Sequence, residues 1–163
     1  MAMLHVDIRS LESKAIPVDG ELTADDAVWQ EGDPLPAEAI RVSGRLSSAG
    51  SGRALLGGRI EGTARVECRR CLTDLTVPVA EDVHLLFAEE GDEEVDDPDV
   101  YVYDPRAREL DLRPAIREQW LLAAPAYALC REDCKGLCPH CGADLNAETC
   151  HCAHVGDVRE STA

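Results

Sequence analysis

Aromatic and basic residues are both scarce in this chain of 163 residues. Phe, Trp and Tyr make up 4% of the sequence, so a core has to be built from Val, Leu, Ile and Ala, and the total hydrophobic content of 45% is sufficient for one. Lys and Arg number 16 against 32 Asp and Glu, which gives a formal net charge of −16. A protein that simply coats RNA is expected to be basic, so the composition argues against that class.

Long apolar runs are also missing. The longest covers residues 120–130 and contains Pro125, which is well short of the roughly 20 residues that span a bilayer. The first residues, MAMLHVDIRSLESK, have no apolar stretch of the kind found in a secretory signal. We therefore expect a cytoplasmic protein of one domain, with no membrane partner.

Motifs for catalysis are not recognisable. The glycine-rich stretch LLGGRIEG lacks the Lys-Ser/Thr pair of a phosphate-binding loop, and no nucleophile, base and acid form a familiar arrangement. We expect a protein that is not an enzyme and has no small-molecule substrate.

Eight cysteines in four close pairs are the most informative feature. The spacings are Cys68-x2-Cys71, Cys130-x3-Cys134, Cys138-x2-Cys141 and Cys150-x-Cys152. In a reducing cytosol, such pairs are more often metal ligands or redox pairs than disulfides. A redox Cys-x-x-Cys is typical of a thioredoxin-like βαβ context, which does not precede the first pair. Four pairs suffice for two tetrahedral four-thiolate sites, and these soft ligands favour zinc, with an iron–sulfur cluster as the main rival.

Sequence separation suggests how the pairs combine around two zinc ions, although it does not fix the pairing. The last four cysteines can close one site almost locally, which leaves the first four for a long-range site. The predicted ligands are Cys68, Cys71, Cys130 and Cys134 in site 1, and Cys138, Cys141, Cys150 and Cys152 in site 2. His140, His151 and His154 flank these residues, but the cysteines already suffice. Closed four-thiolate sites have no open position, so we expect them to stabilise structure.

Alternation of apolar and polar residues predicts a mainly antiparallel β-sheet. Residues 59–69 and 40–46 each place apolar or small side chains on one face, and SSAGSG at 47–52 between them reads as a hairpin connection. A third strand covers residues 75–87, and a bulge is expected where Glu81 interrupts its apolar face. The first Cys-x-x-Cys thus occupies a turn between paired strands.

One principal helix is expected near residues 111–124. Asp111 is a good N-cap, Leu112, Ile116 and Trp120 follow at helical spacing, and Pro125 ends the pattern. The fold class is therefore α+β, with a C-terminal zinc-knuckle segment. The expected organisation is a β-rich core with the Cys-x-x-Cys knuckle at 1–125, a cysteine-rich segment packed on it at 126–155, and a disordered tail at 156–163. Within the core, the block 89–99 carries eight acids and no base, which is typical of a flexible loop.

These motifs together resemble the YceD family. "CRRCL" between two strands is followed by a helix that ends at a proline, and then by the pattern C-x3-C-x-GLCPxCG-x-DLN-x3-C-x-C. The matching residues are Cys68, Arg70, Cys71, Leu72, Cys130, Cys134, Gly136, Leu137, Cys138, Pro139, Cys141, Gly142, Leu145, Asn146, Cys150 and Cys152. Asp144 departs from the Asn of many relatives. The resemblance implies a bacterial, non-enzymatic role in accumulation of large-subunit (23S) ribosomal RNA, with a pre-ribosomal particle as partner.

Charge is distributed unevenly and leaves two function classes open. Residues 41–70 carry seven bases and two acids, whereas residues 71–110 carry two bases and thirteen acids. The basic island offers Arg59, Arg65, Arg69 and Arg70 as candidate RNA contacts, although pairing with nearby acids is the simpler interpretation of such a strand face. Alternatively, the protein is an acidic interaction module that holds a basic ribosomal protein or assembly factor without contacting RNA.

Overall fold

The computed structural model describes residues 4–150 and 152, the side chains of residues 94 and 95 excepted. The predicted tail at 156–163 and the histidines at 151 and 154 lie outside these residues. The chain divides into two compact units. One, here called the β unit, comprises Met1–Ala64 and Thr76–Ala124, and the other, the cysteine unit, comprises Arg65–Leu75 and Pro125–Ala163. The Cys-x-x-Cys turn belongs to the same unit as the C-terminal segment.

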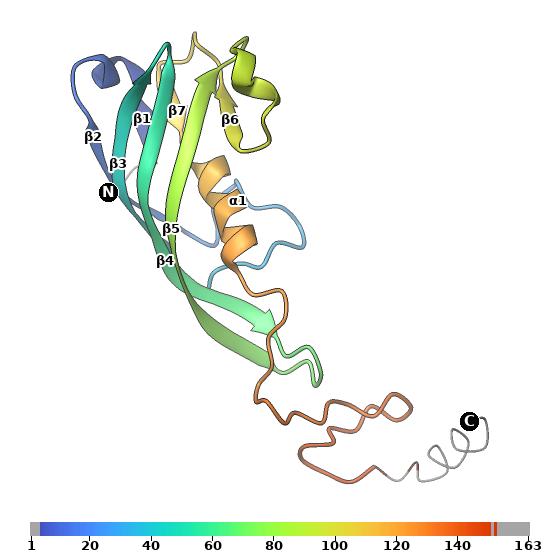
Figure 1. Cartoon of the computed structure of the whole chain (residues 1–163). Coiled ribbons are helices and arrows are strands. Elements are labelled where there is room, and N and C mark those ends of the chain that lie inside the picture. The colour runs from blue at the N-terminus through green and yellow to red at the C-terminus, as the bar shows by residue number, and fades with distance from the viewer. Residues whose placement is uncertain (1–3, 151, 153–163) are drawn as a thin grey trace. The chain divides into compact units, whose positions relative to one another are not determined.

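A five-stranded sheet with the order β2-β3-β4-β5-β6 forms the framework of the β unit (Figure 1). Its strands are β2 (Ile16–Leu22), β3 (Ile40–Gly50), β4 (Arg53–Glu67), β5 (Asp74–Glu89) and β6 (Val100–Tyr103). β2, β3 and β4 pair antiparallel, whereas β6 runs parallel to β5. A separate antiparallel pair is formed by β1 (His5–Asp7) and β7 (Glu109–Asp111). The predicted α+β class is confirmed, with a parallel edge strand that sequence patterning did not indicate.

The one α-helix of the described chain, α1 (Arg113–Ala123), packs against the sheet. It begins one residue later than expected: Leu112 is the N-cap, while the Asp111 carboxylate accepts a hydrogen bond from the Arg113 amide at 3.0 Å. Trp120 is fully buried, and its indole N–H donates to the Pro34 carbonyl at 2.7 Å. A Cβ at Gly62 would lie 3.0 Å from the Trp120 ring, so glycine in β4 makes room for the indole.

Residues 23–39, which connect β2 to β3, are fastened to α1 by ion pairs. Arg117 holds both carboxylate oxygens of Asp33 at 2.7 and 2.8 Å, and Arg113 contacts Asp26 at 3.1 Å. The hydrogen bond from Arg117 lowers the pKa of Asp33 below its ordinary value. These contacts keep the connection over Trp120, which explains how an indole becomes buried in a protein with few aromatic residues.

The hairpin between β3 and β4 is longer than the alternation suggested. β3 continues through Gly50 and β4 begins at Arg53, so the connection consists of Ser51 and Gly52, both with positive φ (54° and 77°). Two residues in this conformation match the twist of a tight hairpin. Small residues at 47–50 read as a loop in the sequence, but cross-strand pairing with β4 makes them part of the sheet.

The acidic segment 89–99 contains a short 3₁₀ turn, η2 (Glu93–Asp96). Asp92 accepts two hydrogen bonds from the Arg53 guanidinium, at 2.9 and 2.8 Å, and the Tyr103 hydroxyl donates to the Gly52 carbonyl. These contacts join Asp92 of the segment and Tyr103 of β6 to the tip of the β3–β4 hairpin. Among the described residues, no helix has the length and apolar composition that crossing a membrane would require.

Gly58→Ala is expected to lower the free energy of unfolding by about 1–3 kcal/mol, because the strands have no space for the added methyl group. A Cβ at Gly58 would lie 2.2 Å from the Ser43 carbonyl oxygen, which is a backbone atom that cannot rotate away. Gly57→Ala is the matched control, since its Cβ would meet only His84 Nδ1 at 3.8 Å, and it should change stability by less than about 0.5 kcal/mol. Urea unfolding of both variants tests this; equal effects would contradict the proposed steric cause.

Candidate metal centres

The cysteine unit brings all eight cysteines together in two groups of four. Within each group, the sulfur atoms lie within 4.8 Å of one another. The first group consists of Cys68, Cys71, Cys130 and Cys134, and the second of Cys138, Cys141, Cys150 and Cys152. Both groups could hold a metal ion.

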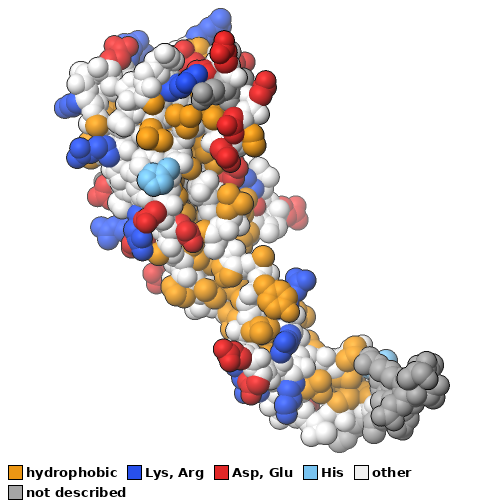
Figure 2. Space-filling view, in the orientation of Figure 1, with side chains coloured by type: hydrophobic (Ala, Val, Ile, Leu, Met, Phe, Trp, Pro, Cys, Tyr) orange, Lys and Arg blue, Asp and Glu red, His pale blue; other side chains and the backbone are white. Residues whose placement is uncertain are grey.

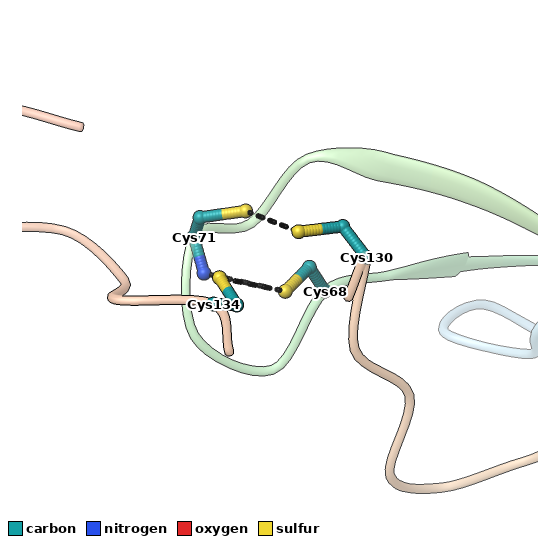
Figure 3. Close-up of side chains that lie close together, drawn as sticks. All are labelled: Cys68, Cys71, Cys130 and Cys134. Atoms are coloured by element: carbon teal, nitrogen blue, oxygen red, sulfur yellow. Dashed lines mark hydrogen bonds between the residues drawn. The ribbon is translucent and has the colours of Figure 1, made fainter. Parts of the chain in front are cut away.

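Distances between the sulfurs suit a tetrahedral ion. In the first group, the Cys68 and Cys134 sulfurs are 3.7 Å apart and those of Cys71 and Cys130 are 3.6 Å apart (Figure 3). Four thiolates about 2.3 Å from a zinc ion would be separated by about 3.8 Å, the edge of that tetrahedron. A disulfide would need about 2.05 Å, and all eight cysteines are free. The donor set and its spacing therefore fit a four-coordinate soft metal.

Backbone hydrogen bonds fasten the two halves of the first group together. The Arg69 amide donates to the Ala128 carbonyl at 2.8 Å, where Cys68 and Ala128 form a parallel bridge. The Arg70 guanidinium donates to the Cys134 carbonyl at 2.9 Å. A Cβ at Gly136, whose φ is 77°, would lie 3.1 Å from the Arg70 carbonyl oxygen, so the chain approaches the turn closely at this glycine.

The two Cys-x-x-Cys turns have the same backbone structure. In each turn, the amide N–H of the first cysteine donates to the carbonyl of the residue five positions later. The distance is 2.8 Å both from Cys68 to Thr73 and from Cys138 to Ala143. The carbonyl of that cysteine accepts from the amide N–H of the residue four positions later, which is Leu72 in the first turn and Gly142 in the second, at 2.9 Å in both. Leu72 and Gly142 both have positive φ, 63° and 75°. The sequence therefore places an exposed leucine where the second turn has a glycine.

Leu72→Gly is expected to leave the first centre as resistant to chelators as before, or to strengthen it by up to about 1 kcal/mol. A left-handed conformation costs an L-residue about 1–2 kcal/mol, part of which is offset because glycine loses more chain entropy on folding. The reverse change, Gly142→Ala, should weaken the second centre by about 1 kcal/mol. Rates of metal transfer to a chromogenic chelator measure both. Faster loss of metal from Leu72→Gly would show that the leucine supports the turn.

Burial and hydrogen bonding distribute protons unevenly in the first group. The pKa of Cys68 is lowered to about 6, chiefly because the Cys71 amide donates to its sulfur. The pKa of Cys130 is raised to about 12 by its hydrogen bond with Cys134 and by desolvation. A bound dication would displace the remaining protons, so metal affinity should fall as the pH falls. Cys68, Cys71 and Cys134 are buried with Leu75, Leu129 and Leu137 packed around them.

The second group is more open to solvent. Cys141 is exposed and Cys150 and Cys152 are half-buried, whereas Cys138 is buried. The sulfur of Cys150 lies 3.2 Å from Cys138 and 3.5 Å from Cys141. Amides of Cys141 and His140 lower the pKa of Cys138 to about 6. For Cys150, the largest single influence is the hydrogen bond from the Cys152 amide, which lowers the pKa. Contacts with Cys138 and Cys141 and the desolvation of the thiol together outweigh it and raise the pKa to about 12.

Asn146 connects the two groups, a role that its place in the sequence motif did not indicate. Its side-chain amide donates to the Cys134 sulfur at 3.2 Å and lowers the pKa of that thiol. Its side-chain oxygen accepts from the Lys135 amide at 2.9 Å and from Arg131 at 2.7 Å. A residue from the loop of the second group thus orients a ligand of the first, the kind of outer-shell support that metal ligands commonly need.

The four candidate RNA-contacting arginines are divided between the two units and differ in the partners they have. Arg59, in the β unit, pairs with Glu61 at 2.7 Å and Asp82 at 2.9 Å. The remaining three are in the cysteine unit, where Arg70 is bound to the Cys134 carbonyl and Arg69 lies over the Tyr127 ring, 5.5 Å from its centroid. Arg65 is exposed and makes no ion pair with any described residue. Arg65 and Arg69 therefore have the most freedom to contact a partner.

The sheet with a single helix and the two four-cysteine groups define a small α+β protein with candidate structural metal centres. The chain belongs to the YceD family, described as large ribosomal RNA subunit accumulation protein YceD, whose model matches residues 56–160. The match includes both cysteine groups and the helix. The family's description names a process and no reaction.

Curated relatives of the chain occur in plants and mycobacteria. A maize protein named large ribosomal RNA subunit accumulation protein YCED homolog 1, chloroplastic, is 36% identical over 69 residues, which is 42% of this chain and 24% of the maize protein. An uncharacterised protein of Mycobacterium bovis is 33% identical over 111 residues, 66% of this chain and 52% of that protein. The chain thus spans about a quarter to a half of these relatives. No solved structure is significantly similar to it.

Proposed function

We propose that this protein is a zinc-stabilised, non-enzymatic factor in biogenesis of the large ribosomal subunit, and that it supports synthesis, processing or stability of the large ribosomal RNA in the cytoplasm. Membership of the YceD family carries the proposal, since the names of the family and of its plant relatives refer to accumulation of that RNA. The partner would be the RNA precursor or a pre-ribosomal particle.

Two zinc ions are proposed as the resident metals, one in each four-cysteine group. The first would be held by Cys68, Cys71, Cys130 and Cys134, and the second by Cys138, Cys141, Cys150 and Cys152. With four thiolates each, such centres have no position left for a substrate, so their contribution is to folding. RNA contact is proposed for the basic island, chiefly through Arg65 and Arg69, because Arg59 and Arg70 already make intramolecular bonds.

A second candidate function is an acidic interaction module that holds a basic ribosomal protein or assembly factor. The charge distribution between the units favours it. The β unit carries 24 acidic and 10 basic residues, whereas the cysteine unit carries eight acidic and six basic residues before its thiols ionise. Such a field repels RNA and attracts basic protein segments.

Sedimentation of cell lysates tests the proposed function. The protein should migrate with large-subunit precursor particles, and its depletion should lower large-subunit ribosomal RNA relative to small-subunit RNA. Arg65→Glu with Arg69→Glu should reduce co-migration at least fivefold if the RNA contact is direct, since each phosphate contact contributes to affinity. Arg9→Glu with Lys14→Glu, which makes the same change of charge at exposed residues of the β unit outside the basic island, is the control. A wild-type protein absent from all ribosomal fractions would refute the proposal.

A further inference from the structure

A groove of about 300 Å³ opens at the β6 end of the β unit. Its walls come from β6, the residues after it, β7 and the first turn of α1. The apolar part of its lining includes Phe87, Tyr101, Val102, Leu110, Pro114 and Ala115, of which Phe87, Leu110 and Ala115 are themselves buried. The half-buried Tyr101 ring packs on the buried Phe87 ring, with the two centroids 5.6 Å apart, so Tyr101 supplies the accessible aromatic surface. This size is at the lower limit of ligand sites and suits one or two side chains.

The strand edge that borders this groove is open at Val102, while the Val100 amide on the same side donates to the Asp97 carbonyl at 3.1 Å. Among the described strands, β6 pairs only with β5. The Tyr103 carbonyl accepts from the Glu90 amide at 2.9 Å, on the side of β5. Because alternate residues of a strand direct their backbone groups to opposite sides, the N–H and C=O of Val102 are directed to the open edge. Val102 is also 49% exposed. Such an edge is able to pair with another extended chain.

The rim of the groove is acidic. Asp104, Glu109 and Asp111 line it, and of these Asp111 is paired with Arg113. Asp104 and Glu109 make no ion pair with any described residue. Residues 87–115, which supply the whole lining, carry eleven acidic and three basic side chains, so Arg106 and Arg108 in the same loop do not reverse the sign. Figure 2 shows acidic side chains beside hydrophobic ones on the side of the β unit where Figure 1 places β6 and η2.

We propose that this groove binds an extended basic peptide segment of a partner protein, which pairs with the open edge of β6 at Val102 and inserts one apolar side chain against Tyr101 and Pro114. Lysine or arginine side chains of the segment would lie along the rim at Asp104 and Glu109. Charge complementarity favours a basic peptide as the ligand. The acidic rim repels RNA phosphates, and it also repels a second copy of this chain, whose formal net charge is −16. The inference rests on the second candidate function, the acidic interaction module, and assigns its binding site to this groove.

Binding is tested with the full-length, metal-loaded protein and a synthetic ten-residue peptide that alternates Lys and Val. Amide NMR shifts should concentrate at residues 101–104 and 109–111. Affinity should fall at least tenfold between 50 and 500 mM salt, because exposed charges are screened over that range. A ten-residue peptide that alternates Lys and Ser, which has the same charge but no apolar anchor, should bind at least fivefold more weakly, and so should the alternating Lys-Val peptide N-methylated at every amide, which cannot donate to a strand edge.

Glu109→Lys should weaken binding of the alternating peptide at least fivefold, while Asp19→Lys should change it less than twofold. Asp19 is an exposed acid on β2, the opposite edge of the same sheet, so both variants change the charge equally. Equal weakening by the two variants would mean that the peptide is attracted nonspecifically and would contradict the proposed binding site in the groove. Equal binding of the N-methylated peptide would overturn strand pairing, and binding of single-stranded RNA at the same residues would overturn the partner class. Co-sedimentation with precursor particles is measured separately, so the wider function can fail or stand without the groove.

Discussion

Cys68→Ser should reduce the metal content of the protein from about two ions to about one per chain and unfold the first four-cysteine group. Cys68 is fully buried, and its sulfur lies 3.7 Å from Cys134. In the described part of the cysteine unit, the buried cluster is made of three cysteines with three half-buried leucines. So small a core does not fold without a metal or a similar crosslink. Elemental analysis of protein purified without added metal gives the stoichiometry.

Proteolysis and circular dichroism show which part of the molecule the change affects. In Cys68→Ser, residues 125–137 should become sensitive to protease, while the thermal melting of the β unit changes little. Cys150→Ser is the matched control: it should also lose one ion, but leave residues 65–75 and 128–134 protected. A metal content of two in Cys68→Ser, or loss of both ions from either variant, would contradict the grouping. Iron instead of zinc in the wild-type protein would contradict the proposed metal.

Trp120→Ala should lower the free energy of unfolding of the β unit by about 3–5 kcal/mol, because it leaves a cavity that the sheet cannot fill. Trp120 is fully buried against Gly62, and its indole N–H satisfies the Pro34 carbonyl. That loss is a large share of the roughly 5–15 kcal/mol by which small domains are stable. Urea unfolding followed by far-ultraviolet circular dichroism measures it.

Trp29→Ala provides the comparison, since it makes the same chemical change at the other tryptophan. Trp29 is half-buried, and its indole N–H donates to the Thr23 carbonyl at 2.7 Å. We expect a loss of about 1 kcal/mol, in the ordinary range for a substitution outside the core. Similar losses in the two variants would argue that the core does not depend on the Trp120 contact.

The sequence by itself determined the local features of this protein. Alternation along 40–46, 59–69 and 75–87 is a direct consequence of burying one face of a sheet, and the burial of Ile40, Ile60 and Phe87 agrees with it. The helix up to Pro125 followed from spacing and from the geometry of proline. The eight cysteines indicated four-thiolate chemistry, because spacing within a pair is itself a local property.

Contacts between distant residues were decided only by the tertiary structure. The parallel pairing of β6, the extension of β3 through Gly50 and the ion pair from Arg53 to Asp92 each depend on segments that approach in space. Asn146 matched a family motif, yet its hydrogen bond to Cys134 requires the loop of one cysteine group to fold against the other. Arginines that the sequence pattern places on one strand face have different partners in the structure: Arg59 pairs with Glu61 and Asp82, whereas Arg69 lies over Tyr127. A one-dimensional pattern reports which side of an element a residue occupies, and folding decides which other element lies on that side.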